Sequence, residues 1–122
     1  MTAQEFVDLV EKYVGQAAIH AVHSQLQKPA GRRPAPHIVR LSAWFNSLAE
    51  ADRAMVSEVI AEAAGSTVFG FYCLLDGSRT VLNNSDRERF DLIYHNEDGA
   101  TKIASTDVGE TEMLHELRGP LT

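Results

Sequence analysis

The sequence has one cysteine, no cationic leader and no long apolar run. Cys73 alone cannot form an intramolecular disulfide, and it lies in an apolar stretch, residues 68–75, where a thiol behaves as a small hydrophobe. The N-terminus carries acidic residues where a signal peptide needs a cationic start. The longest apolar run is about nine residues, roughly half of the ~20 that cross a bilayer. We therefore expect a cytoplasmic protein with no membrane span.

Basic residues are in the minority, since 11 lysines and arginines face 17 aspartates and glutamates, for a net charge of -6. Such a field repels phosphate backbones and anionic membranes, which disfavours nucleic acid and favours a basic partner. The eight glycines form no phosphate-cradling loop, and no serine lies in a nucleophile-elbow motif. The sequence therefore predicts a non-enzymatic protein without a cofactor.

The size and composition are those of one folded unit. The chain has 122 residues, of which 44% are hydrophobic and 23% charged, as in ordinary globular proteins. This length supports one hydrophobic core and is too short for two. We expect residues 1–122 to form a single globular domain.

The N-terminal part has the spacing of helices. Thr2 and Glu5 form a capping-box pattern, and apolar residues then recur at helical spacing to about Gln27. Three prolines and a glycine predict an exposed connector over residues 28–37. A short helix follows, and its periodicity predicts that the indole of Trp44 packs in the core.

The next segment is a clear helix followed by an ambiguous run. Ser47 and Glu50 repeat the capping-box pattern, and Gly65 is a natural terminator of the helix that they begin. Residues 67–75 are so uniformly apolar that the spacing of their hydrophobic side chains does not distinguish a buried strand from a buried helix. We favour the helix, because the rest of the chain offers few strands to pair with.

The C-terminal part predicts the β-structure. Residues 80–82 have the pattern of a short strand, and alternation with a central Asn-Glu-Asp-Gly turn predicts a β-hairpin over residues 90–104. Residues 111–117 predict a last helix that stops at Gly119. The fold class is therefore α+β: a helix-rich single domain with a small antiparallel β-hairpin and a C-terminal helix.

Two weaker groups of residues carry alternative functions. His20 and His23 lie three apart on the first helix, and Glu112 with His115 has an E-x-x-H spacing, so together they form a hypothetical metal site of a small metal-binding protein or enzyme. Solvated helix histidines explain the same pattern. Lys28, Arg32 and Arg33 make a positive connector, which suits either a solvated loop, a partner contact or a nucleic-acid contact without interleaved aromatics.

The uneven distribution of charge is the most informative feature. Residues 1–75 have a net charge of -1, whereas residues 76–122 have a net charge of -5. We expect the hairpin and last helix to form an acidic binding face that steers a basic protein partner. Acidic residues that only keep the protein soluble are the alternative. The residues of this predicted face are Glu97, Asp98, Asp107, Glu110, Glu112 and Glu116.

Four segments carry a resemblance to known proteins. They are residues 44–48, 52–53, 69–77 and 114–117, with sequences WFNSL, DR, FGFYCLLDG and LHEL. They look like small acidic bacterial proteins of unknown function, some of which are similar to toxin-immunity proteins. The resemblance implies a cytoplasmic immunity or antitoxin-like protein that blocks a basic partner, and homodimerisation is compatible with it.

Overall fold

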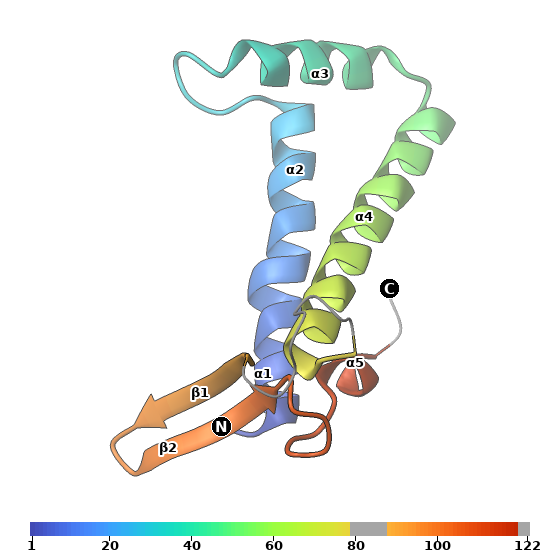
Figure 1. The fold of residues 1–122 in the computed structure, drawn as a ribbon. Helices are drawn as coiled ribbons and strands as arrows, with labels where there is room; N and C mark the ends of the chain where they lie inside the picture. The colour runs from blue at the N-terminus through green and yellow to red at the C-terminus, as the bar shows by residue number, and fades with distance from the viewer. Residues whose placement is uncertain (79–87, 120–122) are drawn as a thin grey trace.

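The computed structural model describes residues 1–78 and 88–119 and shows a helix-rich α+β fold (Figure 1). Its elements are α1 (Ala3–Val10), the π-helix η1 (Glu11–Gln16), α2 (Ala17–Gln27), α3 (Pro36–Ser47), α4 (Glu50–Asp76), β1 (Asp91–Asn96), β2 (Gly99–Ser105) and α5 (Leu114–Leu117). The predicted strand at residues 80–82 lies outside the described residues.

The helices are arranged as two long arms joined by a crosspiece. Helices α1, η1 and α2 follow one another as a single arm, and α4 returns beside them in the opposite direction (Figure 1). The crosspiece is α3, which lies across the far end, where α2 and α4 diverge (Figure 1). The hairpin and α5 lie at the other end, beside α1, so the β-structure and the basic connector are at opposite ends of the arms.

The start of the first arm is the predicted capping box. The Thr2 hydroxyl accepts a hydrogen bond from the Glu5 amide at 3.1 Å, and the Thr2 amide donates to the Glu5 carboxylate at 2.8 Å. These two bonds satisfy amides that have no partner within the helix. The predicted end near Gln27 is confirmed.

Helix α3 is rotated differently from the prediction. Trp44 is 51% exposed and Phe45 is 5% exposed, so the phenyl ring is buried in place of the indole. The reason is polar: the side chains of Ser42 and Asn46 both donate to the Leu26 carbonyl, at 2.8 and 3.1 Å, and fix which face of α3 meets α2. The prediction of a buried Trp44 is wrong.

Helix α4 is longer than predicted and includes residues 67–75, which are helical as favoured. The expected Ser47 cap is absent, because the Ser47 hydroxyl donates to the Trp44 carbonyl and Ala49 takes the cap position. Gly65 does not end the helix: it is buried, and its carbonyl accepts a hydrogen bond from Arg118 at 2.6 Å. This packing outweighs the about 1 kcal/mol that a helical glycine costs.

The length of α4 bears on the expectation that no segment of the chain spans a membrane. The residues before and after Gly65 form one 27-residue helix. An 18-residue segment of this helix has a mean hydropathy of 1.3, and 22% of that segment is buried inside the protein. By length and composition alone, α4 therefore qualifies as a candidate span, and the expectation of no membrane span stays a prediction.

The core lies at the hairpin end. Tyr72 of α4 is fully buried, and its hydroxyl donates to the Val7 carbonyl at 3.3 Å. Burial, together with the neighbouring Glu11 carboxylate, raises the pKa of this phenol well above its ordinary value. Around it pack side chains from both arms, from β2 and from α5, namely Ala3, Val7, Val10, Val68, Ile103, Ala104 and Leu114.

The β-hairpin is confirmed. β1 and β2 pair antiparallel from Asn96 opposite Gly99 to Asp91 opposite Ser105, with an irregularity between Leu92 and Ile93. The buried end of β2, residues 103–105, contacts the helices, whereas the tip projects into solvent (Figure 1). The last helix is shorter than predicted, beginning at Leu114, because a side chain of α4 caps it there.

Gly77 ends α4 in the left-handed conformation, with φ of 74°. A Cβ atom here would lie 2.3 Å from the Thr106 carbonyl oxygen, whereas a Cβ at Gly31, which also has positive φ, would meet nothing within 4 Å. We predict that Gly31→Ala lowers the free energy of unfolding by about 1 kcal/mol, the cost of the left-handed backbone alone. Gly77→Ala should cost at least about twice as much, measured by urea denaturation. Equal losses would show that the contact between Gly77 and Thr106 is unimportant.

Candidate protein-interaction surface

The six acidic residues of the predicted face lie in three places. Glu97 and Asp98 form the hairpin tip, Asp107 and Glu110 lie in the loop after β2, and Glu112 and Glu116 lie just before and within α5. All six are exposed. They share one end of the molecule (Figure 1) without forming a single cluster.

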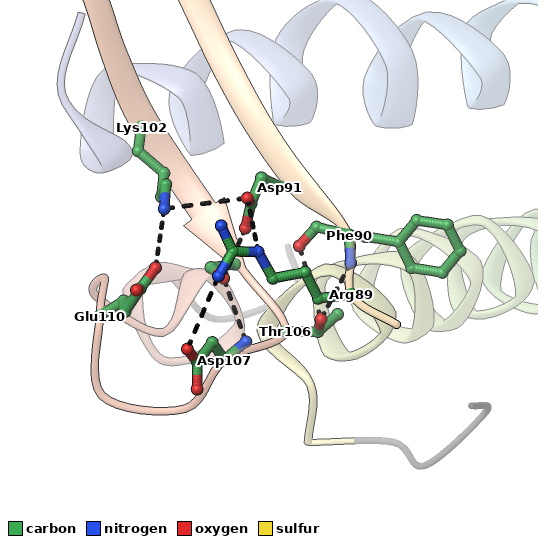
Figure 2. A network of polar contacts seen from close by, with 8 residues as sticks. Arg89, Phe90, Asp91, Lys102, Thr106, Asp107 and Glu110 are labelled. Atoms are coloured by element: carbon green, nitrogen blue, oxygen red, sulfur yellow. Dashed lines mark hydrogen bonds and ion pairs between the residues drawn. The ribbon is translucent and has the colours of Figure 1, made fainter. Parts of the chain in front are cut away.

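The middle pair belongs to a network of ion pairs around Asp91, shown in Figure 2. The Asp91 carboxylate lies 3.0 Å from Nε of Arg89 and 3.8 Å from Nζ of Lys102. Lys102 also donates to Glu110 at 2.8 Å, and Arg89 lies 4.0 Å from Asp107 (Figure 2). Asp107 and Glu110 are therefore paired with cations, and the network fastens the loop to the hairpin.

The network shifts the pKa values of its members. The hydrogen bond from Ser105, with help from Arg89 and Lys102, lowers the pKa of Asp91. The hydrogen bond between Lys102 and Glu110 lowers the pKa of Glu110 and raises that of Lys102. Sequence reasoning missed this arrangement. The register of the hairpin places Asp91 opposite Ser105. That register is the signal in the sequence from which their hydrogen bond could have been predicted.

A second polar site joins α4 to α5. Asp76 is 1% exposed; its carboxylate accepts from the amides of Leu114 and His115 at 2.8 and 2.9 Å, and lies 2.7 Å from Nδ1 of His115. The imidazole and the ring of Phe69 also form a T-shaped pair, with centroids 5.8 Å apart. Asp76 therefore caps α5 and orients the His115 ring.

An Asp–His pair of this kind also occurs in hydrolases, where the second imidazole nitrogen meets a hydroxyl or thiol. Within residues 1–78 and 88–119, no hydrogen bond joins His115 to a serine, threonine or cysteine. Cys73, the one cysteine, is buried on α4. The geometry of the pair is that of a structural cap.

The residues of the metal hypothesis are not brought together. His23 faces an open hollow of about 450 Å³ beside the first turns of α4, with His20 one turn away. His115 lies at the opposite end of α4, about 30 Å along the helix axis. In the part of the chain that the structure describes, no three histidine, cysteine or acidic side chains are placed to hold a metal ion.

The basic connector lies at the end opposite the acidic residues. Lys28, Arg32 and Arg33 are exposed between α2 and α3. In Figure 1 this connector and the hairpin both protrude on the α2 side of the two arms. The molecule therefore has a basic end and an acidic end, separated by the length of α2.

Comparison with protein-family models, with curated proteins and with solved structures finds no match to this chain. The similarity of its short segments to toxin-immunity proteins stays a prediction.

Acid should weaken the network in Figure 2. Because the folded-state pKa values of Asp91 and Glu110 are lowered, their contribution to stability is present above the unfolded pKa of about 4 and is lost as pH falls through the folded pKa. We predict that Lys102→Met destabilises the protein at pH 7, and that its difference from wild type shrinks toward pH 2. Urea denaturation across this range measures both. Lys28→Met, in the exposed connector, is the control, and a pH-independent effect of Lys102→Met would contradict the assignment.

The Asp76 cap should matter more for stability than its histidine partner. Asp76→Ala leaves the buried amide of Leu114 and the partly buried amide of His115 without an acceptor, and we expect a loss of about 3 kcal/mol in the free energy of unfolding. His115→Ala keeps both amide bonds and should cost about 1 kcal/mol. Chemical denaturation of the two variants decides the order, and the reverse order would identify the imidazole as the main support.

Proposed function

We propose that this protein is a non-enzymatic interaction module that binds a basic surface of a protein partner through its acidic end. The acidic end is residues 88–119, the hairpin, its following loop and α5. The observation that supports this proposal most directly is the charge of the segment, which holds eight acidic and three basic residues and so has a net charge of -5.

The basic residues of the acidic end are all paired with particular carboxylates, so the remaining carboxylates carry its unbalanced negative charge. Arg89 and Lys102 are engaged by carboxylates of the network, and Arg118 pairs with Glu11 of the first arm at 2.8 Å. Within the described residues, no ion pair involves the acids of the hairpin tip or those beside α5. Glu97, Asp98, Glu112 and Glu116 are therefore, with Glu88, the negative charges of the acidic end that form no ion pair within the described residues.

A fixed scaffold supports binding by these charges. The buried end of β2 and the Asp76 cap attach the hairpin and α5 to the helical arms, so the carboxylates are held before a partner arrives. Such a preorganised acidic surface accelerates encounter with a basic protein and disfavours acidic ones. By occupying a cationic active or substrate-binding site, it would block that site, as an immunity or antitoxin-like protein does.

Charge reversal tests the proposal. We predict that tagged wild-type protein captures a basic protein from its native lysate, and that capture falls in Glu97→Lys/Asp98→Lys and in Glu112→Lys/Glu116→Lys, because each variant replaces attraction with repulsion. The matched control is Glu58→Lys/Glu62→Lys, which changes the same charge at exposed positions of α4. Mass spectrometry of the captured protein in a salt series is the measurement.

The control decides specificity. Equal loss in all three variants would mean that only net charge matters, and unchanged capture in all of them would exclude the acidic end. The expected pattern is a loss confined to the acidic-end variants, with their difference from wild type shrinking as the salt concentration rises.

A further inference from the structure

The two arms carry a long surface without charge. No aspartate, glutamate, lysine or arginine occurs in residues 13–27 of the first arm or in residues 63–75 of α4. In a chain with 23% charged residues, two uncharged stretches of fifteen and thirteen residues are unusual, and the structure places them side by side. We call the side of this pair that carries Val14, Ala18 and Val22 of the first arm and Ala63 and Ala64 of α4 the neutral face.

The neutral face is hollowed and apolar. A groove of about 400 Å³ runs between α2 and α4, lined by Val14, Ala18 and Val22 on one side and by Ile60, Ala63 and Ala64 on the other. Val14 is 52% exposed and Val59, beside the groove on α4, is 65% exposed. The alanines leave room for a partner helix to approach closely.

We propose that a second copy of this chain covers the neutral face, packing antiparallel about a two-fold axis, so that the basic connector of each copy meets the acidic end of the other. This inference rests on the proposed function, and it identifies the basic surface that the acidic end binds as the connector of a second copy. An uncharged face is matched by another uncharged face, and a two-fold axis provides that match because the same patch serves both copies.

The positions of the two charged ends fit this arrangement. Ala18 lies ten residues, about 15 Å, from the connector at Lys28. It lies eleven residues, about 17 Å, from Val7, which packs against the hairpin end. A two-fold axis near Ala18 therefore superposes the connector of one copy on the hairpin end of the other. Both elements protrude on the α2 side (Figure 1), so the rotation brings them to the same side.

Charge favours the antiparallel over the parallel arrangement. Residues 28–40 carry four basic residues and no acid, whereas the acidic end has a net charge of -5. A parallel pair would place the two acidic ends together, within the ~8–10 Å over which exposed charges interact at physiological salt. The antiparallel pair replaces that repulsion with two attractive contacts.

The neutral face supplies part of the area of a dimer interface. The uncharged stretch of α4, residues 63–75, is about 20 Å long, and two adjoining helices are about 20 Å across. A flat area of these dimensions is about 400 Å², compared with about 800 Å² per partner in a standard interface, so the contacts between the charged ends must supply the rest.

Sedimentation equilibrium of the full chain tests the face. We expect wild type to be a dimer, and Ala18→Glu or Ala63→Glu to raise the dimer Kd at least about tenfold, because each buries an unpaired carboxylate. Ala51→Glu makes the same change at an exposed position in the first turn of α4, outside the neutral face, and should leave the Kd unchanged. Circular dichroism verifies that each variant is folded.

A charge exchange tests the orientation with exposed residues only. Arg32→Glu/Arg33→Glu and Glu97→Lys/Asp98→Lys should each weaken the homodimer about tenfold, because like charges then meet at both ends. An equimolar mixture of the two variants should recover wild-type dimerisation, since each reversed end meets an oppositely charged one. Failure of the mixture to recover would overturn the antiparallel arrangement.

Other outcomes separate this inference from the proposed function. A wild type that is monomeric in sedimentation equilibrium, but still captures a different basic protein through the acidic end, would overturn the dimer and leave the proposed function standing. A dimer unaffected by both charge variants would overturn the orientation and the role of the acidic end. Binding of the monomer to phosphatidylcholine vesicles, lost in Ala63→Glu, would assign the neutral face to lipid and overturn the dimer.

Discussion

The buried carboxylate of Asp76 is the interaction on which the arrangement of the two halves depends. Asp76 is the last residue of α4. Its carboxylate accepts hydrogen bonds from two backbone amides of α5 and lies 2.7 Å from an imidazole nitrogen there, although α5 begins 38 residues later in the sequence. The next residue, Gly77, packs its Cα against the backbone of Thr106 with no room for a side chain. Two successive residues, Asp76 and Gly77, therefore join α4 to α5 and to the loop after β2, next to the core around Tyr72.

Packing is uneven along the molecule. Among the described residues, the hairpin end holds nearly all of the buried hydrophobic side chains, whereas the α3 end buries Leu26 and Phe45. There, hydrogen bonds from α3 to the Leu26 carbonyl take the place of apolar contacts and turn Trp44 outward. The arms between the two ends consequently keep apolar side chains on their surface, which is the usual composition of a surface that associates.

Charge follows the same division. The acidic end retains free carboxylates because its own cations are paired within the network of Figure 2 or with the first arm. The sequence revealed the excess of acid and its location, since both are sums over residues. It did not reveal that Asp107 and Glu110 are paired, or that Asp76 holds His115, because those contacts depend on where the chain returns in space.

The sequence by itself determined the features that arise from neighbours three or four residues apart, or from alternation within a strand. These are the Thr2 cap, the first arm to Gln27 and the hairpin. The sequence favoured a helix for residues 67–75, but the tertiary structure alone decided that this helix continues α4 through Gly65 and that Trp44 faces solvent. Each of these outcomes is set by contacts between segments far apart in sequence, whose energies exceed the local preferences of about 1 kcal/mol per residue on which sequence patterns depend.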